Sequence, residues 1–474
     1  MEDGDIVDAF ISRRGLQLET DATKGQRTVA RRNFRRGEAI ISIPPLFGFP
    51  VHPGEKDEEG EEKESEEDRC YLCFSQVPPR HPRCSQCGIS QYCSAECLTT
   101  HWKQRHYFEC TRIKDSTARV DSKRIKPSFR PWLRMAMGVD CATAATSELQ
   151  GRAPRWLRVQ TVAWTRLVSH RAQHPRHITR QYEEIATVLG SPSAVDALCR
   201  FGCNNFAAAN ESGTIGHLCC PLVSLLLNHS CLPNAAYAYT ASGELLVTAL
   251  TDIRSGDEIS LAYVDGLLPR SQRQKELSAV YFFDCKCIRC SGQAPRALID
   301  ELMDRKPEQE KLPSALPTDF AMPAAVDGWA LKVVAVLLAN AGDSLMLEAV
   351  RGQLARDVSF VAYSHWRECQ DECLDRVAAN ESDAQWPWAA AAALHVLAFY
   401  ALAYPPTHPL VGRQCLKAAQ LAWNALQSSS ANQGVADRAL VGALASAAQS
   451  ILEPPSSSSV GRQIFAILDL VNEK

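Results

Sequence analysis

The chain has 474 residues, a length that predicts two or more domains. Of these residues, 46% are hydrophobic and 22% charged, a composition typical of a globular protein. Its 51 basic and 54 acidic side chains give a net charge of −3, which argues against general binding to nucleic-acid phosphates. With no secretory signal visible, the 19 cysteines are expected in the cytoplasm or the nucleus, where close spacings favour metal binding over disulfides.

Residues 20–50 are predicted to be rich in β-structure. The Arg36–Glu38 turn joins β-rich segments, and Ile40–Ile43 is expected to be a short buried strand. The following stretch, residues 54–68, holds ten acidic residues and two lysines. Because such a block repels itself and cannot bury apolar surface, it is predicted to be a solvated loop.

Eight potential metal ligands follow within 41 residues, enough for two tetrahedral zinc sites. The last pair, His106 and Cys110, are spaced i and i+4 and so share one face of a helix. His101 is an alternative ligand, but it lacks this pairing with Cys110. The eight are Cys70, Cys73, Cys84, Cys87, Cys93, Cys97, His106 and Cys110.

Residues 111–200 show mostly helical patterns, and the chemistry is expected in three later stretches. The segment 225–234 is an apolar run that ends in Asn228, His229, Ser230 and Cys231; taken alone, it reads as a buried strand leaving the core through a polar turn. The segment 256–263 is a turn and a short strand that delivers Tyr263. The segment 283–290 places three cysteines behind an aromatic residue.

The last third of the chain is predicted to be helical, near 329–341, 344–356, 389–404 and 411–427. The stretch 386–404 carries no Lys, Arg, Asp or Glu and is nearly long enough to cross a bilayer. It is rich in alanine, which favours helix far more than lipid, so a buried helix is predicted rather than a membrane span.

In this order, these features resemble the SET- and MYND-domain (SMYD) family of protein-lysine methyltransferases. The resemblance implies an α+β fold: a split SET β-fold with an inserted MYND zinc finger and helical insert, a post-SET zinc site and an all-α, tetratricopeptide-like C-terminal domain. It implies the N-terminal part of SET at 1–50, an acidic loop at 51–69, the MYND finger at 70–110, the helical insert at 111–200, the SET core at 201–274, the post-SET segment at 275–293 and the helical domain at 294–474.

The resemblance also implies the functional residues. Tyr263 takes the position of the active-site tyrosine, and three zinc ions are implied. S-adenosylmethionine would contact Gly25, Arg27, Asn204, Asn228, His229, Tyr263 and Phe283; for Asn204 the alternative is a simple turn asparagine. The zinc sets are Cys70, Cys73, Cys93 and Cys97; Cys84, Cys87, His106 and Cys110; and Cys231, Cys285, Cys287 and Cys290. The spacing of Trp102 and His106 departs from the family by one extra residue.

The activity implied is methyl transfer from S-adenosylmethionine to a lysine of a histone or another protein. The alternative is a catalytically weak or inactive adaptor that recruits Pro-rich partners through the MYND finger in transcriptional regulation. In both cases a monomer is expected, in the cytoplasm, the nucleus or both, with no membrane contact and no clear nucleic-acid binding.

Overall fold

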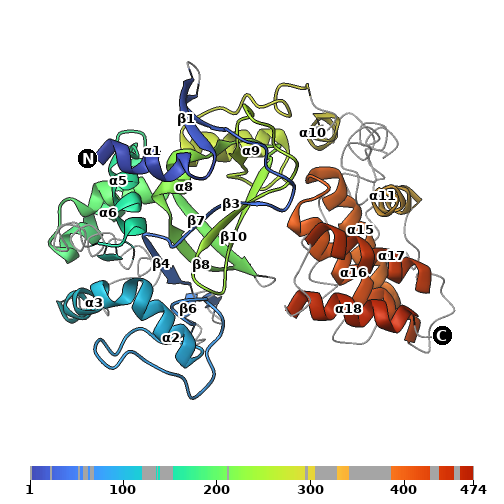
Figure 1. Ribbon diagram of the computed structural model, residues 1–474, viewed down its shortest axis with the longest axis horizontal. Coiled ribbons are helices and arrows are strands. Elements are labelled where there is room, and N and C mark those ends of the chain that lie inside the picture. The colour runs from blue at the N-terminus through green and yellow to red at the C-terminus, as the bar shows by residue number, and fades with distance from the viewer. Residues whose placement is uncertain are drawn as a thin grey trace. The chain divides into compact units, whose positions relative to one another are not determined.

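The computed structural model describes residues 3–21, 24–51, 54–56, 62–64, 69–119, 135, 137–138, 153–210, 213–293, 297–304, 328–340, 386–427, 437–452 and 459–472. It divides into two compact units (Figure 1). The first consists of Met1–Asn228, Ala235–Leu261 and Val280–Phe282, and the second of His229–Asn234, Ala262–Ala279 and Phe283–Lys474. The chain passes from the first unit to the second within β9 (Asn228–His229) and again directly after β12 (Ser260–Leu261).

Small antiparallel sheets form the β-structure of the first unit. The strand predicted at Ile40–Ile43 is confirmed as the main part of β3, and its partner β11 alternates buried and half-buried residues, as a strand with one covered face should. The sheets are β1 (Leu16–Asp21) with β2 (Gly25–Ala30); β10 (Ala235–Tyr239), β11 (Leu245–Ala249) and β3 (Ala39–Ile43) in that order; and β4 (Phe47–Pro50), β8 (Gly213–Cys219) and β7 (Asn205–Asn210) in that order.

The acidic block is not wholly a loop. Two short antiparallel strands, β5 (Gly54–Lys56) and β6 (Glu62–Glu64), lie within it, and the loop prediction is wrong for these residues. Their register sets Glu55 opposite Lys63 and Lys56 opposite Glu62.

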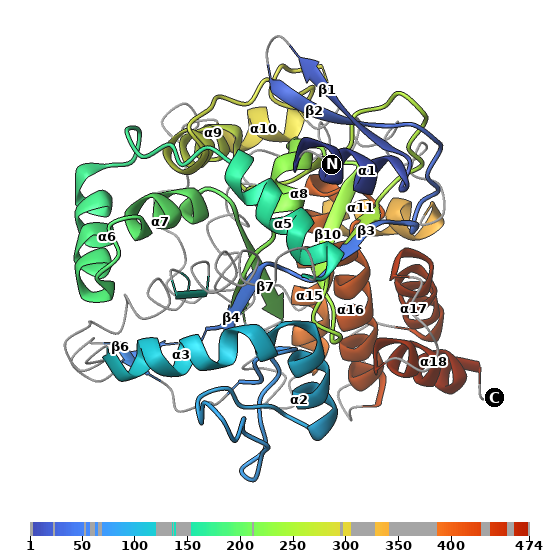
Figure 2. The ribbon, with the colours of Figure 1, turned by 60° about the vertical axis from the view of Figure 1, so that its left-hand side comes forward.

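Helices pack around a core that includes β4 of the first unit. Phe47 and Phe49 of β4 join Leu157, Trp164 and other buried residues of these helices in one hydrophobic cluster. The helical prediction for 111–200 is confirmed where the structure describes it. The helices are α1 (Asp3–Ser12), α5 (Arg155–Arg166), α6 (Arg176–Leu189), α7 (Ala194–Gly202) and α8 (Pro221–Leu226) (Figure 2).

The apolar run before Asn228 is not a buried strand, as the sequence alone suggested. It forms α8, with Pro221 in the first helical turn, and only Leu227 separates that helix from β9. A proline is compatible with the first turn because the amide it lacks would have no partner there. A short apolar run has no periodicity that distinguishes a buried strand from a buried helix. The sequence pattern alone therefore could not predict the helix.

The segment 70–110, called the finger below, is mostly irregular before its helices. Ser94 caps α2 (Ala95–His101) by accepting a hydrogen bond from the Cys97 amide. A π-helical turn, η1 (Trp102–His106), follows and leads into α3 (Tyr107–Arg119). Cys93 and Cys97 thus lie at the start of one continuous helical rod, and His106 and Cys110 farther along it.

The second unit is helical in its described part. Consecutive helices α15, α16, α17 and α18 pack in sequence (Figures 1 and 2) around a core rich in alanine and leucine. The predicted helices near 329–341, 389–404 and 411–427 are confirmed, whereas 344–356 lies outside the described residues. The helices are α9 (Arg270–Glu276), α10 (Ala297–Asp304), α11 (Gly328–Ala339), α15 (Trp386–Ala403), α16 (Pro409–Gln427), α17 (Arg438–Leu452) and α18 (Ser459–Asn472), with the π-turn η4 (Leu277–Tyr281) after α9.

Among the described residues, α15 is the one helix long and apolar enough to cross a membrane by length and composition. Its apolar window is 78% buried within the structure, and Ala389–Leu397 is buried without a break. The buried imidazole of His395 is accommodated because its Nδ1 bonds to the Ala391 carbonyl. This confirms the prediction of a buried helix.

Candidate functional site

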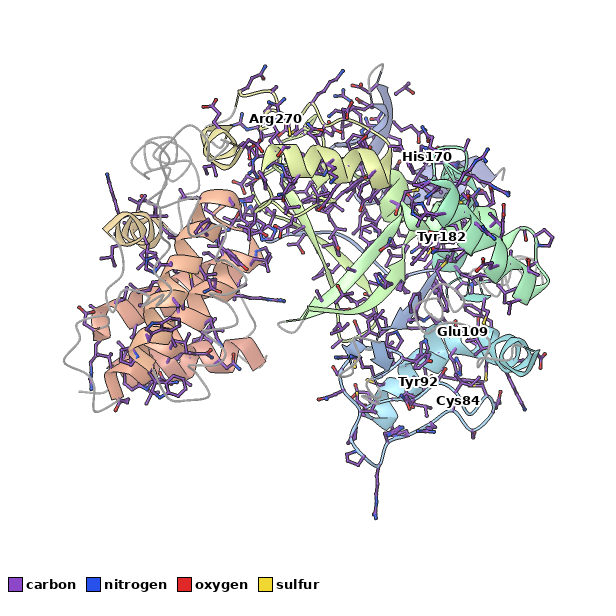
Figure 3. The ribbon with its side chains drawn as sticks, turned by 180° about the vertical axis from the view of Figure 1, so that it is seen from behind. Cys84, Tyr92, Glu109, His170, Tyr182 and Arg270 are labelled. Carbon is purple, nitrogen blue, oxygen red and sulfur yellow. The ribbon has the colours of Figure 1, made fainter. Side chains whose placement is uncertain are left out.

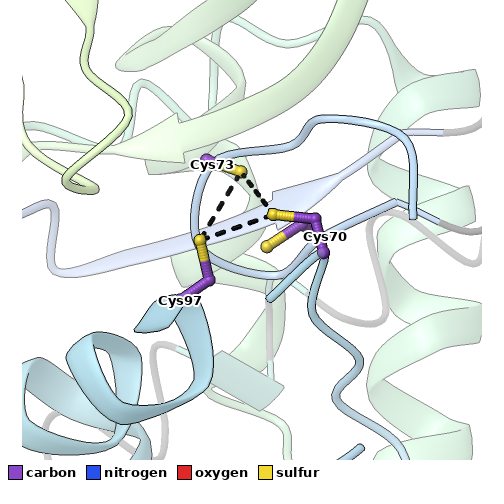
Figure 4. A group of neighbouring side chains, drawn as sticks. Cys70, Cys73 and Cys97 are labelled. Carbon is purple, nitrogen blue, oxygen red and sulfur yellow. Dashed lines mark hydrogen bonds between the residues drawn. The ribbon is translucent and has the colours of Figure 1, made fainter. Parts of the chain in front are cut away.

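The first cysteine cluster gathers Cys70, Cys73, Cys93 and Cys97 from the start of the finger and the first turn of α2 (Figure 4). The Sγ atoms of Cys73 and Cys93 lie 3.6 Å apart, those of Cys93 and Cys97 3.5 Å, and those of Cys97 and Cys73 4.0 Å. The turn after Cys70 brings Cys73 back toward it, with the Phe74 amide bonded to the Cys70 carbonyl and a left-handed φ of 60° at Phe74.

The second cluster gathers Cys84, Cys87, His106 and Cys110, all with their ligand atoms within 4.8 Å of one another. Cys84 and Cys110 are 3.6 Å apart at their sulfurs, and the Cys87 sulfur is 3.6 Å from His106 Nε2. His106 Nδ1 faces Glu109 at 3.2 Å, which fixes the ring so that Nε2 points at the sulfurs. Figure 3 labels Cys84 and Glu109 in this region.

His101 is occupied elsewhere. Its Nε2 accepts a hydrogen bond from Arg105 Nε at 2.7 Å, and its Nδ1 pairs with the Tyr92 hydroxyl at 2.9 Å. Burial lowers the pKa of His101 well below its usual value, and the charge of Arg105 lowers it further, so the ring is neutral. The geometry therefore selects His106, with His101 beside it as a stacked ring 5.3 Å away.

The π-turn explains the unusual spacing of Trp102 and His106. The amide of Tyr107 bonds to the carbonyl of Trp102, five residues back, so this turn holds one residue more than an α-helical turn. The extra residue is taken up inside the rod, and His106 still faces Cys84 and Cys87. Arg105, buried in the same turn, supplies the donor to His101.

The third cluster joins a cysteine directly after β9 to three cysteines after η4, all within the second unit. The Cys231 sulfur lies 3.9 Å from that of Cys285 and 3.5 Å from that of Cys290, and Cys287 completes the group. The turn between Cys285 and Cys290 is closed from the side by Gln274, which bonds both the amide and the carbonyl of Cys285.

A buried cluster of charged residues supports this third site. Arg273 Nε donates to the Cys231 sulfur at 3.3 Å, and the Arg273 guanidinium makes two bonds of 2.7 Å to Asp300. Arg289 reaches the same carboxylate at 2.8 and 3.1 Å and bonds the Gly266 carbonyl. All three side chains are buried. Nothing in the sequence pattern indicated this group, because Asp300 lies 27 residues from Arg273.

The spacing of the donor atoms fits tetrahedral zinc. With Zn–S bonds of about 2.3 Å, two sulfurs on a tetrahedral ion stand about 3.8 Å apart, and a sulfur and a nitrogen about 3.6 Å apart. The donor separations given above for the three clusters run from 3.5 to 4.0 Å. None of the described cysteines forms a disulfide. The twelve residues predicted as ligands are thus brought together as three sets of four.

In the first unit, the residues predicted to contact a cofactor lie in different local settings. Gly25 has a left-handed φ of +77°, and a Cβ added there would meet no atom of the described residues within 4 Å. Arg27 pairs with Glu19, while its buried Nε has no hydrogen-bond partner in the part of the chain that the structure describes. Asn228 donates to the Gln26 carbonyl at 2.7 Å and so ties β9 to the start of β2. The Asn204 side chain bonds the Arg200 carbonyl at the end of α7, as a turn asparagine would.

In the second unit, His229, Tyr263 and Phe283 form one aromatic group. The His229 ring centroid lies 5.3 Å from that of Tyr263 and 5.9 Å from that of Phe283. The Tyr263 amide donates to His229 Nδ1 at 3.0 Å. Burial lowers the pKa of His229 to about 4, so its ring is neutral near pH 7. The group offers aromatic faces of the kind on which a flat heterocycle stacks.

Comparison with known families adds an independent observation. Residues 25–264 match the family model of the SET domain, which is slightly more than half of the chain. The chain belongs to the SET-domain family. The matched range of this SET protein begins at Gly25 and ends directly after Tyr263, so it contains two of the three cofactor stretches expected from the sequence, and Phe283 follows it.

Several curated proteins resemble this SET protein. It is 30% identical over 291 residues to mouse histone-lysine N-methyltransferase SMYD3, covering 58% of this chain and 61% of that protein. It is 27% identical over 296 residues to Arabidopsis thaliana histone-lysine N-methyltransferase ASHR1, covering 60% and 56%. It is 28% identical over 232 residues to SET domain and MYND-type zinc finger protein 6 of Schizosaccharomyces pombe, covering 47% and 43%. The match spans less than two thirds of each relative.

A solved structure, the SET domain of LSMT bound to lysine and AdoHcy, aligns over 99% of this chain and 90% of its own at 10% identity. Its TM-score of 0.31 is too low for the likeness to carry an argument.

Proposed function

We propose that this SET protein is a protein-lysine N-methyltransferase that uses S-adenosylmethionine. The observation that carries the proposal is the match of residues 25–264 to the SET domain. It is supported by relatives named as histone-lysine N-methyltransferases, which are matched over about three fifths of their length or less. The substrate protein and its target lysine are part of the proposal: histones and other proteins are both candidates.

S-adenosylmethionine, when bound, would supply an activated methyl group. The side chain of Tyr263 would orient the target amine, and its own position is set by the hydrogen bond from its amide to His229. Lysine has an ordinary pKa of about 10.4, so the amine must lose its proton before it can accept a methyl group. An apolar channel lowers the pKa of the amine by desolvation, and correct alignment of the reacting atoms removes several kcal/mol of the barrier.

The predicted cofactor residues would each make a different contribution to binding. Phe283 would present an aromatic face to the adenine, while Asn228 and His229 would bind the amino-acid end and the adenine largely through backbone groups. The Asn228 side chain already holds the Gln26 carbonyl, so its contribution would be to fix the start of β2 next to Gly25. The buried Nε of Arg27 is a donor that a carboxylate could satisfy.

The donor sets would hold three zinc ions, two in the finger as a MYND module and one at Cys231, Cys285, Cys287 and Cys290. Four thiolates, or three and an imidazole, are the ligands of structural zinc, which would add folding free energy to irregular segments that have little core of their own. The finger would contact protein partners, with Pro-rich peptides as the candidate class, and the helices α15–α18 would form a tetratricopeptide-like partner surface.

The test is transfer of labelled methyl groups from S-adenosylmethionine to core histones and to a demethylated cell extract. Wild type is compared with Tyr263→Phe and Asn228→Ala, with cofactor binding measured in parallel by calorimetry. Label with wild type and its loss in Asn228→Ala would support the enzyme. A protein that binds no S-adenosylmethionine and transfers no label would refute it and favour the adaptor function.

A further inference from the structure

Both ring nitrogens of His229 are committed to partners within the second unit. Nδ1 lies 3.0 Å from the backbone nitrogen of Tyr263, and Nε2 lies 3.2 Å from the sulfur of Cys231. The side chain is only 8% exposed, so water does not compete freely for either bond. One imidazole therefore joins a residue of the third cysteine cluster to the residue expected at the active site.

The partners determine where the ring proton sits. A backbone amide can only donate, so Nδ1 must carry the lone pair that accepts from Tyr263. In a neutral imidazole the proton is then on Nε2, which donates to the Cys231 sulfur. A thiolate accepts such a bond far better than a thiol does. The preferred tautomer of His229 is thus linked to the ionised state of Cys231.

The Cys231 sulfur would be a thiolate when it binds a metal ion. It lies in the third cysteine cluster, and the guanidinium of Arg273 donates to the same sulfur at 3.3 Å. Two donors, one from His229 and one from Arg273, thus converge on one sulfur atom. This arrangement suits a metal-bound thiolate, whose negative charge outer hydrogen bonds stabilise.

The bond to His229 is one of the contacts that hold Tyr263, which lies beyond the regular structure. The strand β12 stops at Leu261, and Tyr263 follows in an irregular stretch. The bond from its amide to His229 and the contact between the two rings link the orientation of the phenol to that of the imidazole.

We infer that the His229 side chain is a positioning residue that couples the third cysteine cluster to Tyr263. The inference rests on the proposed function, since it assigns to Tyr263 a role in methyl transfer. It differs from the expected role of His229, in which backbone groups contact the cofactor. The Cys231 sulfur orients the imidazole, and the imidazole orients Tyr263; loss of the metal would therefore disturb the active site without removing any residue that touches the substrate.

Two substitutions separate the two bonds. In His229→Asn the amide oxygen can take the place of Nδ1 and still accept from Tyr263, but the side chain is too short to reach Cys231. In His229→Gln the amide nitrogen can take the place of Nε2 and still donate to Cys231, but the acceptor at the position of Nδ1 is lost. The readouts are the rate of methyl transfer to core histones, the affinity for S-adenosylmethionine, and the release of zinc to a chromogenic chelator.

We expect opposite patterns. His229→Asn should release zinc from one site about tenfold faster than wild type, whereas His229→Gln should release it at about the wild-type rate. Both variants lose the imidazole ring, so their kcat values are compared with each other. His229→Gln should have a kcat about tenfold lower than that of His229→Asn, because the Tyr263 amide loses this acceptor. Equal kcat values in the two variants, or equal rates of zinc release, would overturn the inference.

A measurement that needs no activity tests the coupling in the wild-type chain. Nitrogen-15 NMR of labelled histidines distinguishes a proton on Nε2 from one on Nδ1, and the signal of His229 is identified by its absence in His229→Asn. We expect the Nε2–H form in the zinc-loaded protein and a change of this signal when zinc is removed by a chelator. An Nδ1–H form, or a signal that ignores zinc removal, would refute the coupling, whereas absent methyl transfer with the expected signals would refute only the proposed function.

Discussion

Replacing Asp300 by asparagine should strongly destabilise the second unit. The Asp300 carboxylate accepts four hydrogen bonds of 2.7 to 3.1 Å from Arg273 and Arg289, and so compensates both guanidiniums. Both guanidiniums are buried, at 0% and 1% exposure. Asparagine keeps the volume but removes the charge. Its side-chain NH2 group, which can only donate, would face the N–H donors of the guanidiniums.

The size of the effect follows from the two uncompensated cations. Removing one partner of a buried ion pair costs about 3–5 kcal/mol, because the remaining charge stays out of water without compensation. For a unit of roughly 200 residues, 1 kcal/mol moves the melting temperature by about 2–4 °C. The expected fall is therefore about 6–20 °C for the transition of the second unit, measured by scanning calorimetry on the zinc-loaded protein.

Asp304→Asn is the matched control. Asp304 lies on the same helix, α10, and also accepts hydrogen bonds, from Ser271, but it is exposed to solvent. Its loss should lower the melting temperature by no more than about 2 °C, as is usual for exposed polar contacts. If Asp300→Asn melts no lower than Asp304→Asn, then the buried triad contributes nothing net to stability and the reasoning fails.

Three further outcomes are expected. Gly25→Ala should lower the free energy of unfolding by about 1–2 kcal/mol in denaturant unfolding, because φ is +77° and a Cβ there would meet no atom of the described residues that could account for the loss by crowding. Gly25→Asn should recover most of this loss. Equal costs for the two variants would mean that crowding, not φ, matters. Leu394→Ala, at a fully buried position of α15, should cost about 2–5 kcal/mol, against less than about 0.5 kcal/mol for the half-exposed Leu331→Ala. Elemental analysis should find three zinc ions per chain. Acidification from pH 7 to 5 should release them to a chelator, because protons bind the metal-free thiolates and lower the affinity of the sites for zinc as the pH falls. Retention of zinc at pH 5 would contradict thiolate ligation.

The cysteine clusters were the part of the site most accessible to sequence reasoning. Close pairs such as Cys70 and Cys73 indicate a metal site directly, because a short loop can aim two sulfurs at one ion. The interleaving of the pairs came only from the family resemblance. The choice of His106 over His101 rested on helical pairing with Cys110, and the structure brings His106 to the cluster, though through a π-turn that no spacing rule predicts.

The parts that sequence reasoning missed depend on long-range contacts. Arg273, Arg289 and Asp300 each read as an ordinary surface charge on a helix or loop, and only the fold shows that they are buried together. The same is true of the His229 side chain, whose partner Tyr263 lies 34 residues away. The helix α8 was missed for another reason, since a short apolar run carries no periodic signal.

The π-turn at Trp102–His106 has a consequence for how such fingers are found. A turn that takes up one additional residue lets the chain grow by insertion between two ligating stretches while the ligands stay aligned. Sequence comparison by fixed spacing would discard this finger at that point, although the metal-binding atoms of its second cluster converge as well as those of the other two clusters. Searches for zinc fingers that end in a helix should therefore tolerate one inserted residue before the histidine, and this chain supplies the physical reason for that tolerance.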